Sequence, residues 1–155
     1  MNELRELASK LLSDGTVQVV LGWEEGPHGV RPAFAMDAEG AQRLVFDARC
    51  VHNLATYLSP RRSHVARLGR VGVIVKGCDA RAVAGLIRET QVKREDLTII
   101  GVRCGGVSAD ARDTRPLSAQ TVADRCRGCN AHEPRLADHV VGPAVTGFDG
   151  PFRRD

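Results

Sequence analysis

The segment around residue 70 constrains the fold most, because it reads as a strand, a helix and a second strand in close succession. Arg70–Lys76 contains a continuous apolar run of the kind that parallel sheets bury on both faces. Asp79 is predicted to cap a helix over residues 80–90, and Leu97–Val102 is a second apolar strand. Such a unit forms a right-handed crossover, so the two strands are expected to lie parallel in one sheet.

The residues before this unit predict a helix and a hairpin. Apolar residues recur at helical spacing within Glu3–Ser13. Thr16–Trp23 and Val30–Met36 read as strands joined by a Gly-Pro-His-Gly turn, and residues 41–46 suit either strand or helix. The expected fold class is therefore α/β, with a small parallel or mixed sheet, a central βαβ unit, an N-terminal helix and a hairpin.

Beyond Val102 the patterns are weaker. Ser118 is predicted to begin a helix that runs into Cys126–Cys129, and Pro134–Val140 reads as another short helical stretch. Residues 1–142 are expected to form a single α/β domain, and residues 143–155, which contain several Gly and Pro, an extended C-terminal tail.

Length and composition exclude several classes of protein. At 155 residues, 43% apolar and 26% charged, the chain suits one globular domain and not a large multidomain enzyme. Its apolar runs are too short to span a membrane and its first residues do not resemble a secretory signal, so we expect a cytoplasmic protein. Residues 1–47 carry 4 Lys and Arg against 8 Asp and Glu, whereas residues 48–155 carry 18 against 11. The basic part could attract nucleic acid, a phosphate-bearing cofactor or an acidic protein, but the few scattered aromatic residues do not favour nucleic acid.

The five cysteines, an odd number in a chain expected inside the cell, favour metal ligation or thiol chemistry over disulfides. Cys78 and Cys104 follow the two central strands, and the carboxyl ends of parallel strands are where ligands bind in open α/β sheets. Cys126 and Cys129 form a Cys-x-x-Cys pair that can hold one centre from a single turn of backbone. Together they supply four candidate ligands, and Cys50 is expected to lie in the core.

Four thiolates suit either a tetrahedral zinc ion or a cubane iron-sulfur cluster. Structural zinc sites commonly use two short Cys-x-x-Cys pairs, and here there is one, so the placement favours the cluster and leaves zinc as the alternative. His132 stands at ligand spacing from Cys129 and could replace one thiolate. The remaining alternatives are that Cys78 and Cys104 are buried apolar residues, and that the Cys-x-x-Cys pair performs thiol redox catalysis.

Several motifs in order then resemble a known family. The motifs are Val75–Ala82, Leu86–Glu89, Lys93–Asp96, Ile100–Val107 and Cys126–Cys129. This set, over residues 45–142, is similar to the iron-sulfur flavoproteins typified by the beta subunit of deazaflavin (coenzyme F-420) hydrogenases and dehydrogenases, with relatives linked to formate dehydrogenases and heterodisulfide reductases. This chain would be a short form.

The resemblance implies a 4Fe-4S cluster and, in many members, a flavin such as FAD. Carried over by position, the metal ligands would be Cys78, Cys104, Cys126 and Cys129. A phosphate-bearing cofactor would meet residues at the same sheet edge, for which the candidates are Lys76, Gly77, Asp79, Arg81 and Gly105. Basic residues beside the ligands would favour the reduced state, and these are Arg81, Arg103, Arg125 and Arg127.

The resulting expectation is a cytoplasmic electron-transfer subunit that carries one 4Fe-4S cluster within a larger oxidoreductase of the hydrogenase, formate dehydrogenase or heterodisulfide reductase type. It would be an accessory subunit more than an enzyme in its own right. The alternatives are a zinc-stabilised binding module without redox activity and, ranked last, a flavin-dependent oxidoreductase that acts alone.

Overall fold

The structure is a computed structural model that describes residues 2–59 and 64–145. The helices are α1 (Asn2–Ser13), α2 (Ala38–Gln42) and α3 (Gly77–Arg88), with 3-10 turns η1 (Leu54–Leu58), η2 (Val65–Leu68), η3 (Arg94–Asp96) and η4 (Asp124–Cys126). The strands are β1 (Val19–Gly26), β2 (Gly29–Ala35), β3 (Leu44–Val45), β4 (Val71–Val75), β5 (Leu97–Val102) and β6 (His139–Val141). They form one mixed sheet in the order β2-β1-β4-β5-β6, with β3 paired to β1, which confirms the predicted α/β fold.

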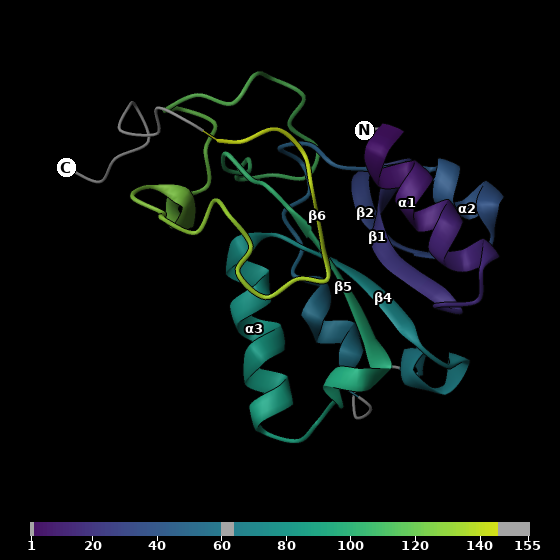
Figure 1. Ribbon diagram of the computed structural model, residues 1–155. Helices are drawn as coiled ribbons and strands as arrows, with labels where there is room; N and C mark the ends of the chain where they lie inside the picture. Colours follow the sequence, from purple (N-terminus) through teal and green to yellow (C-terminus); the bar gives the residue numbers. More distant parts are fainter. Residues whose placement is uncertain (1, 60–63, 146–155) are drawn as a thin grey trace.

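The parallel half of the sheet follows from the central unit of the sequence. All five residues of β4 are buried, as expected for a strand covered on both faces. β4 and β5 are parallel neighbours with Val71 opposite Leu97 and Val75 opposite Gly101. α3 connects them and lies beside both strands (Figure 1). The crossover unit predicted from the sequence is therefore confirmed.

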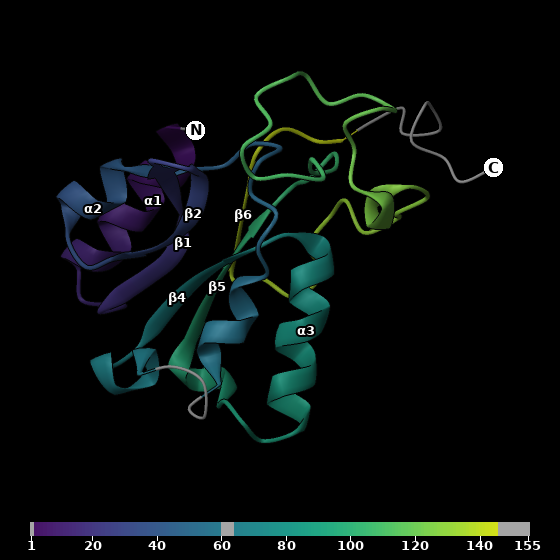
Figure 2. The same ribbon diagram turned by 180° about the vertical axis from the view of Figure 1, so that it is seen from behind.

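The N-terminal half forms the predicted hairpin and its covering helices. β1 pairs antiparallel with β2 and parallel with β4, so the hairpin extends the sheet at one edge. α1 places Leu4, Ala8 and Leu11 in the core, and α2 packs near it beside β2 (Figure 2). The segment that suited either strand or helix contains both, since α2 ends at Gln42 and β3 begins at Leu44.

Two helices predicted beyond β5 are wrong. Ser118 begins a turn and not a helix, because the N–H of Ala123 bonds to the carbonyl of Val107 in another segment, at 2.8 Å. The predicted helical stretch Pro134–Val140 is irregular up to residue 138 and then enters β6, which pairs parallel with β5. The predicted tail lies mostly outside the described residues, which end at residue 145.

The start of α3 also differs from the prediction. The helix begins at Gly77 with Lys76 as its N-cap residue, so Asp79 is the third helical residue and not the cap. Its carboxylate accepts the backbone N–H of Lys76 at 3.2 Å, which still satisfies a free donor at the helix start. As a result Cys78 lies in the first turn of α3. Over residues 2–59 and 64–145, none of the helices has the length and apolar character required to cross a bilayer.

Candidate metal centre

The sheet register brings the first two cysteines to the same edge. Val75 and Gly101 lie opposite each other in β4 and β5. Cys78 and Cys104 each follow three residues after those partners, so they leave the carboxyl edge of adjacent parallel strands at the same level. Cys78 is exposed in the first turn of α3, and Cys104 is buried in the loop after β5.

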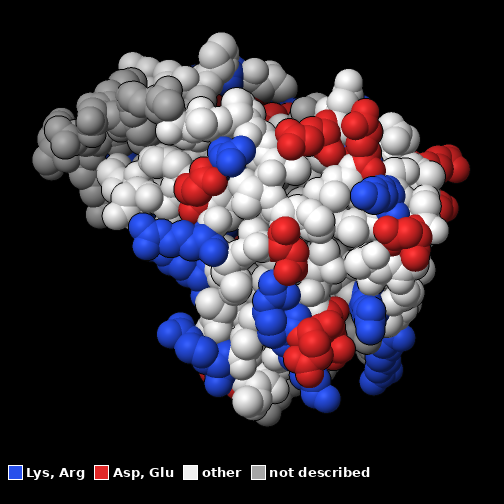
Figure 3. Space-filling model, in the orientation of Figure 1, with Lys and Arg blue, Asp and Glu red and all other residues white. Residues whose placement is uncertain are grey.

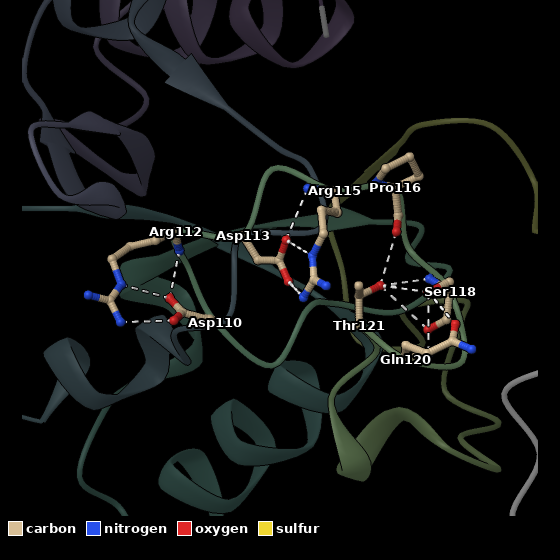
Figure 4. Close-up of polar contacts among 8 residues, drawn as sticks. All are labelled: Asp110, Arg112, Asp113, Arg115, Pro116, Ser118, Gln120 and Thr121. Atoms are coloured by element: carbon tan, nitrogen blue, oxygen red, sulfur yellow. Dashed lines mark hydrogen bonds and ion pairs between the residues drawn. The ribbon is translucent and has the colours of Figure 1, made fainter.

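The third cysteine comes from a segment that folds back along the loop after β5. Ser108 and Val122 form an antiparallel bridge, which places η4 and Cys126 beside Val107. Before this bridge, Thr121 closes a turn by accepting the N–H of Ser118 at 2.8 Å and donating its hydroxyl to the carbonyl of Pro116 at 3.0 Å (Figure 4).

The loop before this turn is held by two local ion pairs. Asp110 pairs with Arg112 and Asp113 with Arg115, and each carboxylate also accepts the backbone N–H of its own arginine (Figure 4). Because these carboxylates bond within their own turns, the basic charge of this loop is neutralised locally. Hydrogen bonding to Arg115 lowers the pKa of Asp113 to about 2.

Glycine allows the segment that carries the fourth cysteine to lie against the sheet edge. A Cβ on Gly77 would collide with the backbone carbonyl of Ala131, two residues after Cys129. A Cβ on Gly101 would meet the ring of Pro134 at 2.6 Å. Both glycines therefore permit a backbone approach that larger residues would block.

Hydrogen bonds fix the same segment to the second cysteine. The N–H of Cys104 donates to the carbonyl of His132 at 3.1 Å, and His132 Nδ1 lies 2.8 Å from the carbonyl of Cys104. His132 was a candidate to replace a thiolate, and the structure places its Nδ1 on a backbone oxygen. The N–H of Cys129 bonds to the carbonyl of Cys126, so the Cys-x-x-Cys pair forms a single turn.

All four predicted ligands line one cavity of about 100 Å³. The wall is completed by both basic and small residues, which are Lys76, Gly106, Val107, Arg125, Ala131 and His132. The cavity is next to a small apolar cluster formed by Cys104, Val107, Val122, Ala123 and Cys126, separate from the main core. Three stretches of chain far apart in sequence thus present their sulfurs to a shared space.

Backbone amides donate to three of these sulfurs. The N–H of Gly106 contacts Cys104 Sγ at 3.4 Å, and the N–H of Val107 contacts Cys126 Sγ at the same distance. The N–H of Ala131 contacts Cys129 Sγ at 3.3 Å. Donors of this kind stabilise negative charge on sulfur, which a metal-bound thiolate carries.

Burial is the main cause of the altered acidity of two of these thiols. It raises the pKa of Cys104 to about 11, against the lowering effect of the Gly106 N–H and of Lys76. The pKa of Cys78 is also raised, first by burial and next by the neighbouring Asp79 carboxylate. A bound metal centre would offset this desolvation cost, because its positive charge compensates the negative charge that a thiolate carries after the proton is lost.

The fifth cysteine lies elsewhere. Cys50 is fully buried in the main core and is not part of the cavity wall. Its thiol donates to the carbonyl of Val45 at 3.7 Å and accepts the N–H of Asp47 at 3.4 Å, so both hydrogen-bonding functions are used locally. The expected core position of Cys50 is confirmed.

The predicted cofactor-binding residues do not share one space. Lys76 has a buried side chain on the wall of the cysteine cavity. Gly77 and Arg81 line a neighbouring cavity of about 160 Å³. Gly105 lines a third, of about 290 Å³, with residues of α1 and of the segment after β6. Asp79 is buried in the first turn of α3.

The four predicted basic residues differ in their contacts. Arg103 pairs with Glu133, and Arg127 lies near Asp124. Arg125 lines the cysteine cavity and donates to the carbonyl of Val51. Arg81 contacts the amide oxygen of Asn130 at 3.4 Å. Basic side chains are exposed on both sides of the view in Figure 3, including the side where α3 lies.

Sequence reasoning missed part of this wall. The amide donors of Gly106, Val107 and Ala131 could not be identified from residue type. The positive φ of +123° at Gly106 explains why residue 106 is a glycine.

Across the described ranges, no group of three or more His, Cys, Asp or Glu side chains is arranged to hold a single metal ion.

Comparison with known proteins supplies a structural likeness. No protein-family model and no curated protein matches the chain. Among solved structures, it is similar to a chain of the F420-reducing NiFe hydrogenase complex from Methanosarcina barkeri, in a xenon derivative. The TM-score is 0.57 at 18% identity, and the match covers 67% of this chain and 38% of that chain. The similarity establishes a shared fold with part of a longer hydrogenase-complex chain.

Proposed function

We propose that this chain is an electron-transfer subunit that holds one 4Fe-4S cluster on Cys78, Cys104, Cys126 and Cys129. The observation that carries the proposal is that four cysteines from three separate stretches of chain line one cavity. The donor set fits the group, because cubane clusters are held by four cysteine thiolates.

The residues around the cavity suit the same role. Backbone N–H groups at Gly106, Val107 and Ala131 would stabilise the negative sulfurs, and Val107 and the buried Cys126 would limit contact with water. A cubane cluster, when bound, takes up and releases single electrons. Cys78 is exposed, so its thiolate would be the ligand nearest to a docked partner.

We infer that the partner is a larger oxidoreductase. The shared fold with a chain of a hydrogenase complex supports this assignment. A relay role does not require a flavin: the residues that the sequence suggested for such a cofactor are divided among three cavities or buried.

Metal analysis of anaerobically purified protein tests the proposal. We expect about four irons and as much acid-labile sulfide per chain, together with visible absorbance that bleaches reversibly on reduction. One zinc per chain without iron would replace the proposal with a structural zinc module. Yellow absorbance released on denaturation would indicate a flavoprotein instead.

A further inference from the structure

Lys76 carries a buried positive charge on the wall of the cysteine cavity. Lys76 is 1% exposed, whereas the other two lysines of the chain are exposed. The ammonium lies 2.9 Å from Asp79 Oδ2, 2.9 Å from the carbonyl of Cys50 and 3.1 Å from the carbonyl of His52. It also lies 4.6 Å from the centre of the Trp23 ring.

Asp79 links this ammonium to a predicted ligand. Its Oδ2 contacts Lys76, and its Oδ1 lies 3.7 Å from Cys78 Sγ. The carboxylate is 4% exposed, so water screens neither charge well. Lys76 thus lines the cavity, and its ammonium is paired with the carboxylate that contacts Cys78.

Packing alone does not account for this pair. Transfer of two charges from water into a core costs free energy, and apolar residues of similar volume often replace such a pair without loss of stability. Two other contacts of the ammonium are to neutral carbonyls, which would also accept from an uncharged donor, and a third is to the Trp23 ring, which favours a cation. A charge that is retained beside a redox centre has a direct effect, because nearby charges set how readily the centre accepts an electron.

We propose that Lys76 and Asp79 tune the reduction potential of the centre in opposite directions, with Lys76 raising it and Asp79 lowering it. The inference rests on the proposed function, since it assigns these residues an effect on that same centre. Added negative charge on reduction is stabilised by the ammonium and opposed by the carboxylate. Neither side chain is a ligand in this account.

Redox titration of the iron-loaded protein tests the proposal, with wild type, Lys76→Met and Asp79→Asn compared by visible absorbance. Lys76→Met should reduce the affinity for an electron about tenfold, which corresponds to a fall of 59 mV for a one-electron couple. Asp79→Asn should raise the affinity for an electron by a similar factor, which moves the potential upward. Lys93→Met, at an exposed lysine outside the cavity wall, is the matched control and should leave the potential unchanged.

The opposite signs separate tuning from a structural role, which would move both variants in the same direction. Asp79→Asn keeps an acceptor oxygen for the ammonium, so it tests the charge even where Lys76→Met fails to load iron. Shifts of equal sign, an unchanged potential in Asp79→Asn, or loss of iron from both variants would overturn the inference. Wild-type protein without iron would overturn the proposed function as well, so the two failures are distinguishable.

Discussion

The chain buries cysteine sulfur in two regions with different surroundings. Cys50 lies within the main core, where its thiol donates to one backbone carbonyl and accepts one backbone N–H. Cys104 and Cys126 lie in the small cluster at the sheet edge, where they accept backbone N–H groups and line a cavity with two further cysteines. Burial raises the pKa of Cys50 to about 12 and that of Cys104 to about 11.

The difference shows that burial and thiol acidity do not by themselves mark a ligand. Both regions contain a buried thiol whose pKa is raised. A backbone N–H donates to sulfur in both regions, so what separates them is a cavity that cysteines from several segments line together. The following variants test this distinction, beginning with the largest expected effect.

Serine substitution should separate the two regions completely. Cys78→Ser, Cys104→Ser, Cys126→Ser and Cys129→Ser should each lower bound iron from about four per chain to less than one, because a cubane requires four thiolates. Cys50→Ser should retain the full iron content. Iron and sulfide analysis after anaerobic reconstitution measures both. Equal iron loss in Cys50→Ser would show that the ligand set is wrong.

Gly77→Ala should disturb the cavity without touching a sulfur. The added Cβ would collide with the carbonyl of Ala131 and push the Cys129 turn away, at a cost of about 1–3 kcal/mol. Gly85→Ala in the same helix is the control, since its Cβ meets nothing within 4 Å and should stabilise α3 by about 0.5–1 kcal/mol. Urea unfolding and iron retention report the effects. If the two variants behave alike, the close approach at Gly77 has no importance for the site.

Thr121→Val should have a smaller effect on the turn that places Cys126. The substitution leaves the N–H of Ser118 and the carbonyl of Pro116 without their partner hydroxyl, at a cost of about 1–2 kcal/mol. Chelator challenge should remove iron faster from this variant than from the wild type. Thr121→Ser, which keeps the hydroxyl, should behave like the wild type, and equally fast loss from both variants would show that the hydroxyl is not what holds the turn.

The last prediction concerns the pH dependence of stability. Since burial raises the pKa of Cys50 from an ordinary value near 8.5 to about 12, its neutral thiol stabilises the fold below pH 8.5 and this stabilisation declines as pH rises toward 12. Urea unfolding of wild type and Cys50→Ala at pH 8, 9 and 10 isolates this residue, because both proteins keep the other cysteines. The free energy of unfolding of the wild type should fall by up to about 1.4 kcal/mol more per pH unit than that of Cys50→Ala. Parallel pH profiles would contradict the assignment of Cys50 to the core as a neutral thiol.

Local patterns predicted the elements that local interactions determine. β4, α3 and β5 each contain enough apolar residues at the correct spacing to specify their type, and their parallel register then placed Cys78 beside Cys104. The sequence predicts helices in the segments after β5, one of them because Ser118 resembles an N-cap residue. Their backbone groups instead pair with Val107 and with β5, which are interactions between distant segments that no local pattern specifies.

The candidate site was predictable to the same extent. Residue type and spacing selected the four cysteines that line the cavity and assigned Cys50 to the core. The sequence suggests Lys76 as a contact for a phosphate-bearing cofactor because it lies at the sheet edge, but its ammonium bonds to Asp79 and two backbone carbonyls. That position depends on where the chain places the carbonyls of Cys50 and His52, which spacing does not determine.

An anomalous-difference map at the iron absorption edge, from crystals of anaerobically reconstituted protein, tests the central claim most directly. The account predicts a single compact iron peak inside the cavity, in contact with the sulfurs of Cys78, Cys104, Cys126 and Cys129. A cavity that contains only side chains, or a peak that appears at the zinc edge and not at the iron edge, would contradict it.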